Sequence, residues 1–140
     1  MTPDQHQALV DELIRDEGVR AKPYMDTVGK VTIGCGRNLT DVGLSQAEIM
    51  VLLENDIHRA VVEAETFGWF GGLDETRQRV ILNMLFNLGK SRFSLFKDTI
   101  HAIAVQNYEQ AAQHMLASAW AHQVGKRADR LAEMMRTGHG

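Results

Sequence analysis

Three polar residues near the start of the chain have types and spacing that suit acid–base chemistry on a sugar. They are Glu17, Asp26 and Thr32. Hydrolysis of a glycosidic bond requires two carboxyl groups: one protonates the leaving oxygen, and the other activates a water or supports the developing positive charge. A hydroxyl can hold that water. Each residue also has a purely structural interpretation, as a helix-end carboxylate, a turn residue and a strand residue.

Glu17 is expected at the C-terminal end of a helix, next to Asp16. The helix dipole is negative at that end, so two acidic side chains are placed where acids are unfavourable. The neighbouring carboxylate and the helix end both favour the protonated form of Glu17. A protonated carboxyl near neutral pH is what a general acid needs, and the sequence therefore predicts that Glu17 is the proton donor.

The elements that position these groups begin with a helix from Pro3 to Gly18, which Thr2 can cap together with Gln5. Residues 19–38 contain a proline, several glycines and short β-prone runs, which predicts a β-hairpin with its turn near residues 27–30. If the turn folds back over the helix end, the two carboxyl groups reach one cleft, and the hydroxyl sits on the returning strand.

The remainder of the chain has helical periodicity. A second capping box at Ser45 and Glu48 starts a helix that runs towards Glu65, and Asp74 can cap another that stops at Gly89. Further helical stretches are expected at about 92–105, 107–118 and 125–136. The pattern predicts a mostly helical α+β fold within one domain, residues 1–140. Its hairpin lobe and connecting helix would span about 17–66, and its larger helical lobe 1–16 and 67–140.

Composition narrows the class of protein. The chain has 140 residues, of which 44% are hydrophobic and 24% charged, as in a globular domain. Its net charge of −3 gives no support for nucleic-acid binding. Cys35 is the only cysteine, so no internal disulfide is possible, and a turn or packing role is expected for it. The histidines lack zinc-type spacing, and we expect no metal and no cofactor. No apolar run suits a signal peptide or a membrane span, so synthesis in the cytoplasm is expected.

A family resemblance covers nearly the whole chain. Residues 15–38 resemble the catalytic segment of phage-type lysozymes, glycoside hydrolase family 24, which carries Glu, eight residues, Asp, five residues and Thr. Residues 73–89 resemble the family's central helix, and residues 118–138 resemble its C-terminal helices. Three ordered blocks are far more specific than one motif.

The resemblance implies a two-lobed, monomeric muramidase that cuts the β-1,4 bond between N-acetylmuramic acid and N-acetylglucosamine in bacterial peptidoglycan. It implies Glu17 as general acid, with Asp26 and Thr32 positioning and activating water in an inverting reaction. A phage or prophage lysis enzyme fits best. Such an enzyme would wait in the host cytoplasm and reach the wall through the periplasm with the help of a membrane-permeabilising holin.

The resemblance also suggests substrate-binding residues. Arg127 lies where the family places an arginine near the catalytic glutamate, although a plain surface arginine is the alternative. Asn83 and Phe86 would line the sugar cleft or, alternatively, pack in the core. Trp120 is expected to be a core residue rather than a sugar platform.

Three departures from the family pattern stand out. The segment between Asn38 and Ser45 is short, which would trim the outer sugar contacts. Arg37 replaces a common histidine, and we expect it to pair with an acid such as Asp56. The net charge is acidic where many lysozymes are basic, which would make binding to the anionic wall weaker or more salt-sensitive.

Two alternatives remain open from the residues. A lytic transglycosylase needs a catalytic glutamate but no second carboxylate, and it leaves 1,6-anhydro ends. An inactive wall-binding or structural module, such as a phage tail component, needs neither. The spacing of Glu17, Asp26 and Thr32 argues against both.

Overall fold

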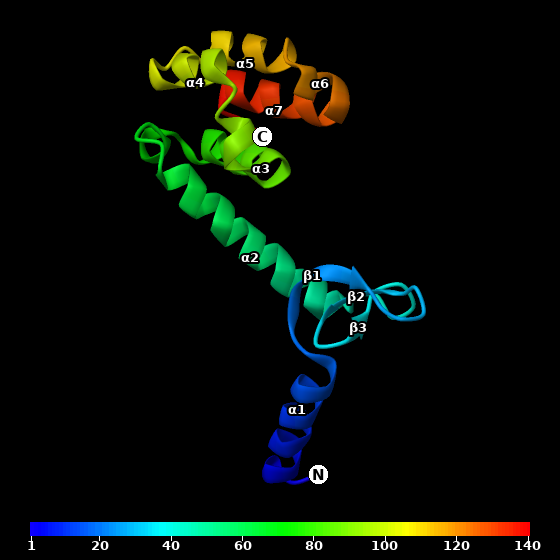
Figure 1. Cartoon of the computed structure of the whole chain (residues 1–140). Coiled ribbons are helices and arrows are strands. Elements are labelled where there is room, and N and C mark those ends of the chain that lie inside the picture. Colours follow the sequence, from blue (N-terminus) through cyan, green and yellow to red (C-terminus); the bar gives the residue numbers. More distant parts are fainter. The chain divides into compact units, whose positions relative to one another are not determined.

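The computed structural model describes residues 1–140, which divide into two units, Met1–Val51 and Leu52–Gly140. Seven α-helices and a three-stranded antiparallel sheet confirm the predicted α+β class (Figure 1). No helix is long and apolar enough to cross a membrane. The residue limits that the sequence predicts for the two lobes remain a prediction.

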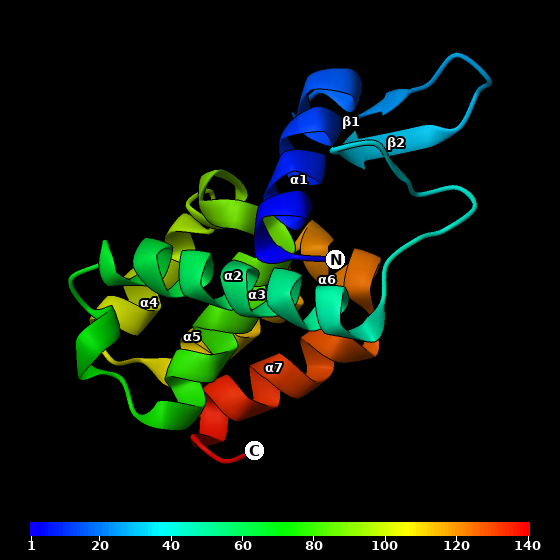
Figure 2. The ribbon, with the colours of Figure 1, turned by 90° about the horizontal axis from the view of Figure 1, so that it is seen from below.

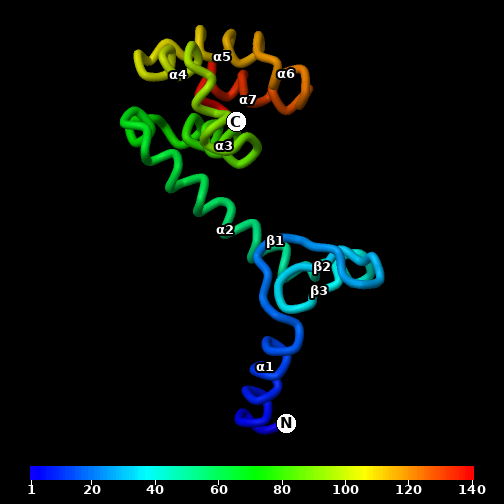
Figure 3. The backbone as a smooth tube through the Cα atoms, viewed as in Figure 1, coloured from blue at the N-terminus to red at the C-terminus, as the bar shows by residue number.

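The first unit opens with helix α1, Pro3–Glu17. The Thr2 hydroxyl oxygen accepts a bond from the backbone N–H of Gln5 at 3.2 Å, which confirms the predicted cap. At the other end, the N–H of Gly18 closes the last turn on the carbonyl of Ile14 at 2.8 Å. Helix α1 thus ends at Glu17. The chain then passes from α1 into the sheet (Figure 3).

The sheet has the order β1-β2-β3, with β1 at Arg20–Met25, β2 at Val31–Gly34 and β3 at Arg37–Asn38. The predicted hairpin is confirmed, and Thr32 lies opposite Tyr24 on one side and Asn38 on the other. The register shifts between Arg20 and Tyr24, where Pro23 has no N–H to give to the ladder. The third strand was not predicted, because two residues are too few to show a period.

Helix α2, Gln46–Glu65, starts with the predicted capping box. The N–H of Glu48 donates to the Ser45 hydroxyl at 3.1 Å, and the N–H of Ser45 donates to the Glu48 carboxylate at 2.9 Å. The two residues therefore satisfy each other's free backbone donors at the helix start.

The prediction that Arg37 pairs with Asp56 is wrong. Arg37 instead lies 2.7 Å from the carboxylate of Glu48, while Asp56 is bound to Arg59 one turn along α2 at 2.8 Å. Arg37 also donates to the carbonyl of Gly43 at 3.1 Å. Its guanidinium therefore ties β3 to the start of α2, both within the first unit.

The second unit is helical. After the 3-10 turn η1, Phe70–Gly72, its helices are α3 (Glu75–Phe93), α4 (Lys97–Ala104), α5 (Tyr108–Leu116), α6 (Ala119–Val124) and α7 (Lys126–Thr137). Helix α7 packs on α3, α5 and α6, and α4 packs on α5 (Figure 2). Asp74 caps α3 by accepting from the N–H of Arg77 at 3.1 Å, as predicted.

Some predicted boundaries in this unit need correction. Gly89 does interrupt α3, with φ 77° and ψ 162°, but a further helical turn follows it. The stretch expected from residue 92 begins only at Lys97. Helix α6 was not predicted as a separate element, although the Ser118 hydroxyl caps it by accepting from the N–H of Ala121.

The buried hydrophobic core consists of residues of the second unit. Its largest fully buried side chains are Phe93, Ile81, Met84, Leu85, Ile103, Met115, Met135 and Val80. Trp120 belongs to it, as predicted, with 4% of its surface exposed. Its indole N–H donates to Asn87 at 2.8 Å, which satisfies the one polar atom of the side chain.

Glu48→Gln is expected to remove an acid-dependent part of the stability while keeping the capping box. The hydrogen bond from Arg37 lowers the pKa of Glu48 from 4.5 to about 2. The pair therefore stabilises the folded chain fully above pH 4.5, and this contribution is lost as the pH falls towards about 2. Urea unfolding across this window should show a steeper loss of stability in the wild type than in the variant.

Glu54→Gln is the matched control, because Glu54 lies on the same helix but outside any ion pair. It should follow the wild-type curve. Equal slopes for the wild type and Glu48→Gln would contradict the assignment.

Candidate active site

Glu17 is placed by the end of α1 and by the turn between β2 and β3. A Cβ atom added to Gly36 would lie 2.9 Å from Oε2 of Glu17, closer than real Cβ contacts occur, and 3.0 Å from its Cδ. Gly36 also has φ +72°, a conformation that favours glycine. The backbone of this turn thus lies directly against the Glu17 carboxyl group, and a side chain at position 36 would displace it.

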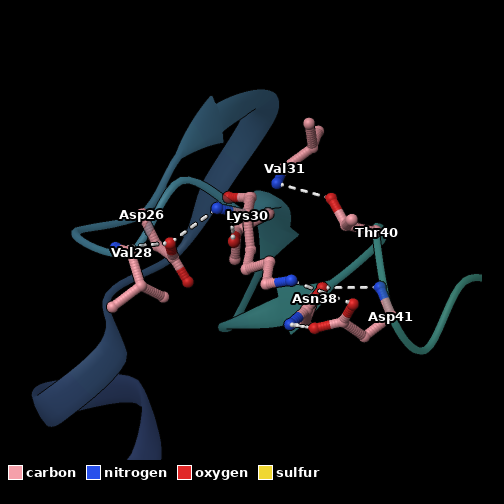
Figure 4. A network of polar contacts seen from close by, with 8 residues as sticks. Asp26, Val28, Lys30, Val31, Asn38, Thr40 and Asp41 are labelled. Carbon is pink, nitrogen blue, oxygen red and sulfur yellow. Dashed lines mark hydrogen bonds and ion pairs between the residues drawn. The ribbon is translucent and has the colours of Figure 1, made fainter.

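Asp26 follows β1 and organises the turn of the hairpin. Its Oδ1 accepts from the N–H of Val28 at 2.9 Å and from the N–H of Lys30 at 2.8 Å (Figure 4). Its own N–H donates to the carbonyl of Lys30 at 2.9 Å. These bonds fix the carboxylate through one oxygen. The other oxygen has no partner within the protein and can accept a bond from water or substrate.

Thr32 lies on β2 and is the only buried residue among positions 1–51. Its hydroxyl donates to the carbonyl of Lys30 at 3.1 Å. The hydroxyl oxygen keeps its lone pairs and can still accept a bond. The preceding residue, Val31, is 37% exposed, as the alternation of a strand requires.

The three predicted residues therefore belong to one unit, and two of them are bound to the same residue. The N–H of Lys30 is bonded to Asp26, and its carbonyl is bonded to Thr32. The sequence reasoning missed the roles of Lys30 and Gly36. Gly36 stands in the Thr-Ile-Gly-Cys-Gly run, so a signal was present, but only the structure shows which carboxyl group it faces.

The residues expected to bind substrate lie in the second unit. Arg127 donates through Nε and Nη2 to Oδ1 of Asn83, at 2.9 and 2.7 Å. Both residues line a hollow of about 470 Å³ together with Phe86 and mostly apolar neighbours. Asn83 and Phe86 are exposed, so they do not pack in the core. Their contact with a sugar stays a prediction.

Two of the relatives of this chain carry lysozyme names. Two proteins of Dictyostelium discoideum, "Probable T4-type lysozyme 1" and "Probable T4-type lysozyme 2", are 27% and 28% identical to it. The alignments cover 94% of this chain and 95% of each relative. The "Pre-baseplate central spike protein Gp5" of Enterobacteria phage T4 is 24% identical over 96% of this chain, but the match covers 28% of that protein.

A family comparison extends over most of the sequence. The family described as "Phage lysozyme" matches residues 15–136. This range includes Glu17 at the end of α1 and the hairpin that carries Asp26 and Thr32, and it continues through the helices of the second unit. The chain therefore belongs to the phage lysozyme family and is a lysozyme, a glycoside hydrolase that acts on peptidoglycan.

Proposed function

We propose that this lysozyme hydrolyses the β-1,4 bond between N-acetylmuramic acid and N-acetylglucosamine, with inversion at the anomeric carbon. Glu17 protonates the leaving glycosidic oxygen, and Asp26 with Thr32 holds and activates the attacking water. The observation that carries the proposal is the unpartnered carboxylate oxygen of Asp26, in a group whose other oxygen is fixed by two backbone N–H bonds.

The bonding of Asp26 suits a base better than a nucleophile that must move. Its bonded oxygen anchors the side chain, and its free oxygen can take a proton from water. The Thr32 hydroxyl is fixed by the carbonyl of the same residue, Lys30, and can accept the second water hydrogen. A positioned water on the face of the sugar opposite the acid is what an inverting hydrolase requires.

The glycan is proposed to contact Phe86, Asn83 and Arg127 as well. The exposed ring of Phe86 offers an apolar surface for a pyranose face, and the paired Asn83 and Arg127 side chains offer hydrogen bonds. The bonds between Asn83 and Arg127 hold both side chains in one geometry, which reduces the entropy lost on binding.

The biological setting belongs to the same proposal and rests on the sequence resemblance alone. The enzyme is a monomer that serves phage or prophage lysis, made in the host cytoplasm and released to the wall by a holin. Expression with and without a holin tests this route: lysis should require the holin. Lysis that proceeds equally well without any permeabilising partner would contradict it.

Glu17→Gln is expected to lower the rate of reducing-end release from purified peptidoglycan by about 10² to 10⁴, because the general acid is lost. Turbidity of permeabilised Gram-negative cells gives a second readout. Equal rates in both proteins would mean that Glu17 is not the acid. Products ending in 1,6-anhydro sugars would instead indicate a transglycosylase.

The anomer released first distinguishes inversion from retention. NMR of the products formed within the first turnovers should show the α-anomer at the new reducing end, since the β-linkage is inverted by water attack. The Asp26→Asn variant should form product no faster than the Glu17→Gln variant does. A β-anomer would rule out the proposed role of the Asp26 and Thr32 water.

Gly36→Ala is expected to lower kcat by about 10²-fold, because the new methyl group displaces the Glu17 carboxyl and misplaced acids are costly. Gly34→Ala is the matched control. Gly34 also has a positive φ of 68°, but a Cβ there would meet nothing within 4 Å.

Both variants should lose about 1–2 kcal/mol of stability from backbone strain. Thermal unfolding would measure this loss, and only Gly36→Ala should lose activity per folded molecule. The same kcat in both variants would contradict the close approach as a constraint on Glu17.

A further inference from the structure

Lys30 joins the two groups proposed to hold the water. Its N–H is bonded to the carboxylate of Asp26, and its carbonyl accepts from both the Asp26 N–H and the Thr32 hydroxyl. The relative position of carboxylate and hydroxyl therefore depends on where this one residue is held. Any contact that fixes Lys30 from outside the turn therefore also fixes the Asp26 carboxylate and the Thr32 hydroxyl.

The loop that follows β3 makes such contacts. The ammonium of Lys30 lies 3.2 Å from the carboxylate of Asp41. The Thr40 hydroxyl accepts from the N–H of Val31 at 2.8 Å (Figure 4). The N–H of Leu39 donates to the carbonyl of Val31 at 2.7 Å. Lys30 and Val31, at the end of the hairpin turn, are thus bound by three successive residues of the loop, Leu39, Thr40 and Asp41.

Asn38 makes the loop itself rigid. Its side-chain amide donates to the Asp41 carboxylate at 3.1 Å and accepts from the Asp41 N–H at 2.9 Å. Its backbone carbonyl accepts from the N–H groups of Val42 and Gly43. Asn38 is also the ladder partner of Thr32. Asp41 is therefore held by a residue that is itself fixed to the sheet.

We propose that Lys30 and Asp41 are positioning residues for the reaction. Their ion pair holds the hairpin turn against the loop that follows β3. This keeps the Asp26 carboxylate and the Thr32 hydroxyl at the separation that one water needs. The inference rests on the proposed function of those two groups. The short segment between Asn38 and Ser45 then has a second effect besides making the outer part of the lobe smaller: it holds the site residues in place.

The expected effect is moderate in size. The side chains of Lys30 and Asp41 are 38% and 53% exposed, so solvent weakens their attraction. Catalysis, however, is sensitive to small displacements of a base from its water. Breaking the pair should lower kcat by about two- to fivefold, with KM unchanged.

The test measures kcat and KM for reducing-end release by the full chain. Asp41→Asn and Lys30→Met should each lower kcat by this factor, and the double variant should be no slower than either, because all three remove one interaction. Asp56→Asn is the matched control and should match the wild type, because it removes an exposed ion pair of α2.

Two results would overturn the proposal: a wild-type kcat in Asp41→Asn, or a raised KM with unchanged kcat. The second result would mean that Lys30 binds substrate directly. Glu17→Gln in the same assay separates this outcome from failure of the proposed function. If Glu17→Gln is inactive while Asp41→Asn is normal, only the positioning role is lost.

Discussion

The geometry of the site depends on the hydrogen bonds of one peptide segment, the end of the hairpin turn at Lys30. The carboxylate of Asp26 is fixed by an N–H of this residue, and the hydroxyl of Thr32 is fixed by its carbonyl. Backbone groups cannot rotate away as side chains can, and an ordered peptide pays its entropy cost on folding rather than on binding substrate. The turn is therefore a preorganised support for the two groups that are proposed to share one water.

Glu17 is held by a different constraint, which is steric. The absence of a side chain at Gly36 allows the backbone of the β2–β3 turn to lie against the glutamate carboxyl. An acid that must donate a proton and later recover it gains from having few fixed hydrogen bonds, whereas a base that orients water gains from being anchored. The two carboxyl groups of the site differ in this way, although both stand in the same unit.

Much of this arrangement could be predicted from sequence, because it rests on local signals. Capping residues such as Thr2, Ser45 and Asp74 act on donors within three positions, so their spacing shows the helix starts. Contacts that cross elements could not be predicted. The sequence offers several acids as partners for Arg37. Only the register of β3 and the position of the start of α2 show that the partner is Glu48. Strand β3 itself is two residues long and leaves no pattern.

The buried core and the candidate site residues Glu17, Asp26 and Thr32 lie in different units of the chain. The hydrophobic core lies in the second unit, whereas Thr32 is the only buried residue of positions 1–51. Hydrophobic burial supplies most of the stability of a folded domain, and losing a core side chain commonly costs about 2–5 kcal/mol. The first unit is instead held by capping bonds, ion pairs and backbone contacts of its loops, each worth about 1 kcal/mol. Substitutions there are therefore expected to change the placement of Glu17, Asp26 and Thr32 with little effect on the core of the second unit.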